Sequence, residues 1–167
     1  MSCLSDIQKC IHKSAIVEGV GRNFLEEKGT NTKVQLCTDG KYLLYDFEKI
    51  KQPLFPFFER SAKVKGLNSI ADKVIFIEDS KDELWIFVIE LKQNKGNPQN
   101  QLFATKLFVE FLLKSVNRFC KTNYKPKIRG IGYSKNYRPN TKPKNPYDKV
   151  NNAYVTGDKL ILSNYLI

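Results

Sequence analysis

The sequence predicts one domain of mixed α/β class, with a central mixed β-sheet flanked by helices. The expected elements follow in the order helix, strands, apolar strand, helix and strand. Residues 84–89, LWIFVI, are wholly apolar and lead into the triplet Glu90-Leu91-Lys92, and a strand this apolar is typically covered on both faces. We therefore expect this strand in the middle of the sheet. A chain of 167 residues is long enough to bury one hydrophobic core and short for two. We therefore expect residues 1–167 to form a single domain.

The N-terminal region is predicted to be helical. Ser5 and Gln8 form a capping-box start, and apolar residues then recur at helical spacing through Ala15. Gly19 marks a break, so one broken helix or two short helices cover residues 5–28.

Four β-prone segments are predicted to form strands or hairpins, because turn signals lie in them or at their boundaries. They are residues 33–47, 71–92, 127–134 and 153–166. The first is expected to turn at Asp39-Gly40, which is a strong short hairpin signal. The second turns at a polar tip centred on Lys81. The last is expected to be a closing hairpin about Gly157-Asp158.

The long helix is predicted to begin at Asn97-Pro98, which supplies an N-cap and a first-turn proline. It runs to about Phe119. Its expected inward-facing residues are Leu102, Leu107, Phe108, Phe111 and Leu112.

The charge of the chain indicates a polyanionic partner. The formal net charge is +11, and basic side chains with interleaved tyrosines fill the region from Lys121 to Lys149, which includes a basic, Pro-rich loop at about 135–149. Such groups neutralise phosphates and stack on unpaired bases. A solvated lysine-rich loop is the alternative. The candidate nucleic-acid-binding residues are Lys125, Lys127, Arg129, Lys135, Arg138, Lys142, Tyr133 and Tyr137.

Localisation is predicted to be cytoplasmic. No apolar stretch approaches the roughly 20 residues that cross a bilayer, so no membrane association is expected, and the N-terminus lacks the pattern of a secretory signal. The four cysteines are scattered without metal-binding spacing. Reduced thiols and no zinc site are therefore expected.

A candidate catalytic site follows from the second hairpin. Asp72 and Glu90 are equidistant in sequence from Lys81, so a symmetric hairpin places them directly opposite each other, with Cβ atoms roughly 5 Å apart. Alternation puts Lys92 on the same face as Glu90. Two carboxylates this close repel each other as bare anions, but they bind a hard divalent cation such as Mg²⁺. Lys92 would then orient or help deprotonate an attacking water and stabilise charge on phosphorus.

A structural ion pair is the alternative interpretation of the same residues. A buried charge is costly unless it is paired. Glu90 would then simply pair with Lys92 or with Lys73 at the end of the strand.

These residues resemble the core of the PD-(D/E)XK nuclease superfamily, which has the restriction-endonuclease-like fold. That core has an Asp, a hairpin turn, a hydrophobic strand ending in (D/E)xK and then a helix. The matching segments are IAD at 70–72, VIELK at 88–92 and QNQLFATKL at 99–107, and the resemblance spans roughly residues 5–134. Ala71 departs from the pattern, because the family has proline there.

The resemblance implies roles for individual residues. Asp72, Glu90 and the backbone carbonyl of Leu91 would be metal ligands for Mg²⁺ or Mn²⁺, and Lys92 would be the catalytic lysine. Gln101 looks like the glutamine that several branches carry near the metal, with Gln99 as a substitute. An acid on the first helix often completes such sites, and the candidates are Glu18 and Glu26.

The predicted function is a metal-dependent nuclease that hydrolyses phosphodiester bonds, with DNA favoured over RNA. A DNA endonuclease in repair, mobile-element biology or defence fits best, as a homodimer or part of a larger defence complex. One alternative is a non-catalytic nucleic-acid-binding or complex-assembly subunit with the same fold. Another is an effector that cleaves RNA.

Overall fold

The mixed α/β class predicted from the sequence is confirmed by a computed structural model, which describes residues 2–27, 32–49, 69–92, 98–134, 152–155 and 159–166. Short 3-10 turns lie at Lys13–Ala15, Phe47–Lys49 and Leu162–Tyr165. The helices and strands are α1 (Cys3–Cys10), β1 (Ile16–Glu27), β2 (Thr32–Asp46), β3 (Lys73–Glu78), β4 (Leu84–Lys92), α2 (Gln99–Cys120), β5 (Lys127–Ser134), β6 (Asn152–Val155) and β7 (Lys159–Ile161).

The strands form one mixed sheet in the order β1-β2-β3-β4-β5-β6, and β7 pairs with β2 outside this path. The first four strands are antiparallel neighbours, whereas β4, β5 and β6 run parallel to one another. β4 is therefore an internal strand, as the apolar run predicts. Every residue from Leu84 to Leu91 is buried.

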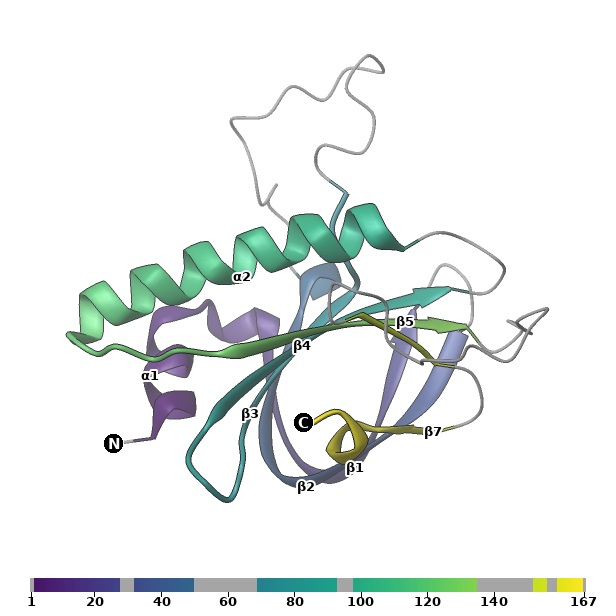
Figure 1. Ribbon diagram of the computed structural model, residues 1–167, viewed down its shortest axis with the longest axis horizontal. Helices are drawn as coiled ribbons and strands as arrows, with labels where there is room; N and C mark the ends of the chain where they lie inside the picture. The colour runs from purple at the N-terminus through teal and green to yellow at the C-terminus, as the bar shows by residue number, and fades with distance from the viewer. Residues whose placement is uncertain are drawn as a thin grey trace, which may run out of the picture.

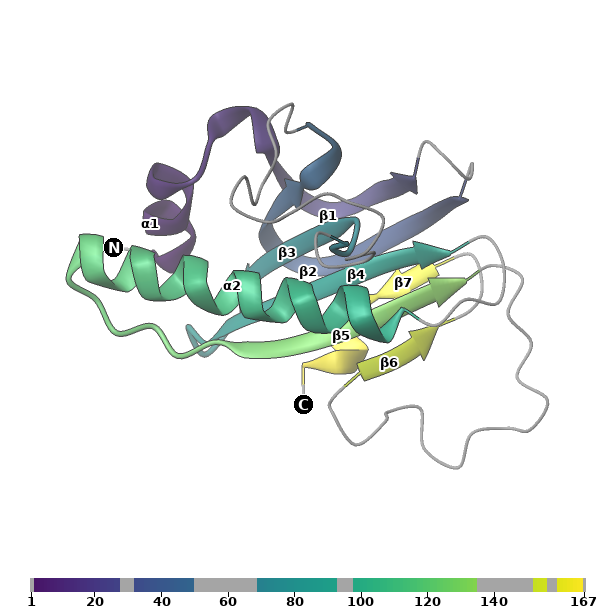
Figure 2. The same ribbon diagram turned by 90° about the horizontal axis from the view of Figure 1, so that it is seen from above.

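The two faces of the sheet belong to two separate hydrophobic clusters. Val74 and Val88 pack with residues of α1 and α2. Ile75 and Ile89 belong to the cluster of Leu25 on β1, Leu36 on β2 and Leu160 on β7. Figure 1 shows α2 lying across one face while β1 and β2 curl around the other. Seen from above in Figure 2, α2 runs along β4 and β5, and its N-terminal end lies over the C-terminal ends of these strands.

The helical prediction for residues 5–28 is wrong beyond α1. Residues from Ile16 to Glu27 form β1, which pairs with β2. Gly19, expected as a helix break, lies under the ring of Tyr42, and a Cβ at Gly19 would lie 2.1 Å from a ring carbon of that tyrosine. The glycine is therefore required by a close contact between strands.

The hairpin predicted at Asp39-Gly40 is also wrong, because both residues lie within the continuous strand β2. The ladder with β1 shifts register there: Val20 pairs with Lys41, and Arg22 pairs with Cys37. Three residues of β2 thus oppose a single residue of β1. The Asp-Gly dipeptide is accommodated by this irregularity, where a glycine is well tolerated.

The second hairpin is confirmed together with its register. Lys73 pairs with Ile89 and Ile77 pairs with Trp85, and each pair is equidistant in sequence from Lys81. The side chain of Asp79 fixes the turn, since Oδ1 accepts hydrogen bonds from the backbone N–H groups of Lys81 and Glu83, at 2.8 and 2.9 Å.

The long helix is confirmed within two residues of its predicted ends, and its buried face agrees in part with the expected one, since Leu102 is buried and Phe108 and Leu112 pack against the core. Leu107 and Phe111 are 52% and 69% exposed, and Thr105 and Val109 are buried instead. β6 and β7 form where strands are predicted, but they pair with β5 and β2 and make no hairpin. Neither described helix has the length and apolar character needed to span a membrane.

Candidate active site

Asp72, Glu90 and Lys92 come together at the end of the β3–β4 hairpin. Asp72 directly precedes β3, and its Oδ2 accepts a hydrogen bond of 2.7 Å from the backbone N–H of Leu91. Glu90 alternates with Ile89 along β4, so it lies on the same face as Val88, which is the face covered by α2. Lys92 occupies the next position on that face and makes an ion pair with Glu90.

The ion pair accounts for a buried carboxylate. The side chain of Glu90 is 1% exposed and that of Lys92 is 29% exposed. A buried carboxylate without a counter-charge would be protonated or would destabilise the fold. The ion pair that the structural alternative predicts is thus present. The Nζ of Lys73, which is the other candidate partner, contacts Asp46 at 2.7 Å.

The start of α2 is tied to the segment that leads to Asp72. The Oγ of Thr105 accepts a hydrogen bond of 2.7 Å from the backbone N–H of Ala71 and donates one of 2.8 Å to the carbonyl of Gln101. A proline has no N–H to donate. The alanine that stands where the resemblance expects proline therefore has a structural role of its own.

Gln101 and Gln99 lie on the first turn of α2, and both are half-buried. The contact of Thr105 with Gln101 and Ala71 places this turn close to Asp72. The structure therefore places the backbone of the predicted glutamine region near Asp72.

Ser134 is a site residue that the sequence analysis missed. β5 lies parallel to β4, so that Gly132 pairs with Glu90 and Ser134 pairs with Lys92, which puts all four on the face of α2. Gly132 leaves room beside Glu90. Ser134 is 8% exposed, and its Oγ has no hydrogen-bond partner within the described part of the chain. Alternation along residues 127–134 puts Ser134 and Tyr133 on opposite faces, but the sequence does not show which of them faces α2.

The prediction of a first-helix acid is wrong, because Glu18 and Glu26 both lie on β1. Glu18 accepts a hydrogen bond from Gln8 and lines a cavity with Glu78, which ends β3 at the opposite end from Asp72. Glu26 is exposed and pairs with Lys33 at 2.5 Å. Neither acid joins the site.

The candidate oxygen donors for a cation at this hairpin end are the carboxylates of Asp72 and Glu90, and the resemblance adds the carbonyl of Leu91. No cluster of three or more histidine, cysteine, aspartate or glutamate side chains suited to a metal occurs within the ranges that the structure describes. Hard oxygen donors of this kind suit Mg²⁺ or Mn²⁺, which keep several waters.

The described basic candidates lie at the other end of β5. Lys125 is exposed. The Nζ of Lys127 contacts Glu83 at 2.6 Å and lies 4.7 Å from the ring centroid of Trp85, while the guanidinium of Arg129 lies 5.2 Å from it. Lys127 and Ser134 are seven residues apart along β5, which is about 23 Å in a strand.

Tyr133 is wrong as a stacking residue. Its exposure is 0%, and it packs in the cluster on the face away from α2, so no base can reach its ring. Lys135, Tyr137, Arg138 and Lys142 lie outside the described residues.

Comparisons with protein-family models, curated proteins and solved structures found no match to this chain.

Proposed function

We propose that this chain is a metal-dependent nuclease that hydrolyses phosphodiester bonds, with DNA as the favoured substrate. The observation that supports this function best is that Asp72, which directly precedes β3, and Glu90 of β4 come together at the open end of the β3–β4 hairpin, with Lys92 paired to Glu90. Two acids and a lysine at one end of a hairpin are the groups that cation-assisted phosphoryl transfer needs.

The donor set fits a hard divalent cation. Asp72, Glu90 and the carbonyl of Leu91 would hold it, and water would complete its shell. When bound, Mg²⁺ or Mn²⁺ would polarise the phosphate and lower the pKa of a bound water. The hydrogen bond from Leu91 to Oδ2 fixes the Asp72 carboxylate in place.

The remaining groups of the site would bind and orient the substrate. Lys92 carries a positive charge that would stabilise the negative charge that develops on the phosphate oxygens. The N-terminal end of α2 lies over the same strand ends (Figure 1), and the positive end of a helix favours phosphate. Ser134 and Gln101 would supply neutral hydrogen-bond donors.

The substrate class is inferred from charge. With a formal net charge of +11, the chain attracts polyanions at long range. The basic, Pro-rich residues at about 135–149, which lie outside the described part of the chain, directly follow β5 in the sequence, and β5 ends beside Lys92. Their position in the sequence would let them hold the phosphodiester backbone next to the site.

A non-catalytic nucleic-acid-binding subunit is the second candidate, and the Glu90–Lys92 ion pair supports it. In that case the pair stabilises the end of β4 and the carboxylates hold no cation. Such a protein would bind nucleic acid without cleaving it.

The experiment is incubation of the purified chain with supercoiled, linear and branched DNA and with RNA, in Mg²⁺, Mn²⁺ or EDTA. We expect cleavage of DNA with either metal and none in EDTA. Glu90→Gln and Lys92→Ala should each lower the rate by orders of magnitude. Glu83→Gln is the matched control, because Glu83 also pairs with a lysine next to β4 but lies at the other end of the hairpin.

Each result separates the candidates. Binding without cleavage under every condition would support the non-catalytic subunit. Cleavage of RNA alone would identify an RNA-cleaving effector. Cleavage by folded Glu90→Gln at the rate of the Glu83→Gln control would reject the site.

A further inference from the structure

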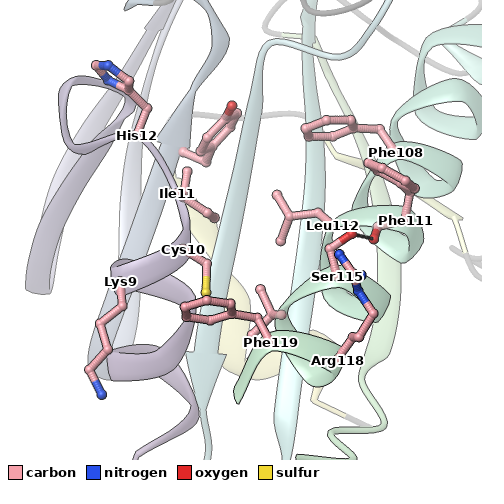
Figure 3. A pocket seen from close by; sticks show the side chains of 12 residues that line it. Lys9, Cys10, Ile11, His12, Phe108, Phe111, Leu112, Ser115, Arg118 and Phe119 are labelled. Atoms are coloured by element: carbon pink, nitrogen blue, oxygen red, sulfur yellow. Dashed lines mark hydrogen bonds between the residues drawn. The ribbon is translucent and has the colours of Figure 1, made fainter. Parts of the chain in front are cut away.

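Two cysteines meet where α1 and α2 end. Cys10 is the last residue of α1 and Cys120 is the last residue of α2, and their Sγ atoms lie 3.9 Å apart although the residues are 110 positions apart in the chain. Cys10 is exposed and Cys120 is half-buried. Figure 3 shows Cys10 in the groove that α1 and α2 line together.

The two sulfur atoms are held near each other by a packed framework. Ile7 of α1 and Val116 of α2 are buried in the same cluster, and the hydroxyl of Tyr124 donates a hydrogen bond of 2.8 Å to Asp6 across the same junction. A disulfide has an S–S distance of about 2.05 Å. The sulfurs therefore have to approach by nearly 2 Å for a disulfide to form.

The other two cysteines have no second sulfur within hydrogen-bonding distance in the described part of the chain. Cys3 is 3% exposed, and burial, followed by the charge of Glu78, raises the pKa of its thiol to about 12. Cys37 lies on β2, paired with residues of β1 and β7. No third metal-ligating side chain joins Cys10 and Cys120 among the described residues, so the pair favours sulfur chemistry over zinc binding.

We propose that Cys10 and Cys120 are a redox site that forms a reversible intramolecular disulfide by exchange with a small-molecule disulfide of the glutathione class. The exposed thiolate of Cys10 attacks one sulfur of oxidised glutathione, which forms a mixed disulfide and releases one glutathione thiolate. The thiolate of Cys120 then attacks the sulfur of Cys10 and releases the second. Two electrons pass from the protein to the oxidant, and the two thiol protons leave with the two glutathione molecules.

The disulfide would join the C-terminal ends of both helices and close a loop of more than a hundred residues. A crosslink across so long a loop restricts the unfolded chain strongly and stabilises the folded state. The expected consequence is resistance to unfolding under oxidising conditions. This chemistry is independent of the proposed nuclease activity.

The test uses the full chain, equilibrated in glutathione buffers of graded ratio. After alkylation in denaturant, mass spectrometry should find a Cys10–Cys120 crosslink with Cys3 and Cys37 alkylated. The oxidised chain should melt at least roughly 5 °C higher than the reduced chain. Cys10→Ser and Cys120→Ser should each abolish both effects, whereas Cys37→Ser should keep them.

Three results would contradict the proposed disulfide. A crosslink that includes Cys3 or Cys37, a glutathione adduct on Cys10 that Cys120 does not resolve, or fully alkylated chain at every ratio would each overturn the proposal. Mapping the alkylated residues of the unmutated chain gives the answer even where a serine variant fails to fold.

Discussion

The backbone N–H of Ala71 and the hydroxyl of Thr105 form a buried hydrogen bond that joins the segment before β3 to the first turns of α2. Both residues are 0% exposed. Asp72 follows Ala71 directly, so this bond sets the position of a candidate metal ligand relative to the helix.

Thr105→Val should destabilise the protein without a change in side-chain size. It leaves the buried N–H of Ala71 without its acceptor, which costs about 1–3 kcal/mol. Urea unfolding of the variant and of the unmutated chain measures the difference. Thr105→Ser keeps the hydroxyl and should therefore recover most of the lost free energy of unfolding. Equal stability of the valine and serine variants would show that the hydrogen bond contributes nothing.

Lys92→Met should destabilise the fold because it leaves the Glu90 carboxylate buried without its counter-charge. Breaking a buried pair typically costs 3–5 kcal/mol. The side chain of Lys92 is 29% exposed, so about 2 kcal/mol is expected here. The free energy of unfolding from urea titration gives the value.

The double variant Glu90→Gln with Lys92→Met should be more stable than Lys92→Met alone, since no buried charge remains. The coupling energy of this cycle measures the ion pair. Under the proposed function the double variant is folded yet inactive, which separates chemistry from folding. Additive effects of the two substitutions would show that the side chains do not interact.

The sequence predicts the β3–β4 hairpin well because its information is local. Apolar residues continue through both strands, and the polar tip is symmetric about Lys81, so the register that pairs Lys73 with Ile89 needs no knowledge of distant contacts. The same holds for α2, whose N-terminal proline at Pro98 and long apolar pattern lie within the segment itself.

The mispredicted elements depend on contacts distant in sequence. β1 is a strand because it pairs with β2, and Gly19 is needed because the ring of Tyr42 covers it. Tyr133 and Ser134 alternate on β5, but only the position of α2 decides which of them faces the site. A sequence read segment by segment does not contain these contacts.

Acid should weaken the junction of α1 with the segment after α2. The hydrogen bond from Tyr124, and then Lys9, lower the pKa of Asp6 below its ordinary value of 3.8. A carboxyl group with a lowered folded-state pKa adds stability above its unfolded-state pKa, and this stability is lost as the pH falls through the folded-state pKa. The contribution of Asp6 should therefore be complete near pH 5 and decline below about pH 4.

Asp6→Asn tests this dependence. Urea unfolding at several pH values should show the variant less stable than the unmutated chain at pH 7, with the gap closing as the pH falls below about 4. Tyr124→Phe removes the main hydrogen bond to Asp6 and should show a gap that closes in the same range. A gap of constant size down to pH 2 would mean that the charge of Asp6 contributes no stability.

The basic loop should carry much of the affinity for nucleic acid. Each phosphate contact adds about 0.7 to 0.9 to the slope of log K against log salt. The triple variant Lys135→Ala, Arg138→Ala and Lys142→Ala should therefore bind DNA more weakly and show a slope flatter by about 2 to 3.

The control is a triple alanine variant that removes the same charge from three exposed lysines elsewhere in the sequence, Lys13, Lys41 and Lys114. Fluorescence anisotropy over a range of salt, in EDTA to prevent cleavage, gives both slopes. Equal slopes for the two variants would show that the loop acts only through net charge, and that the phosphates are held elsewhere.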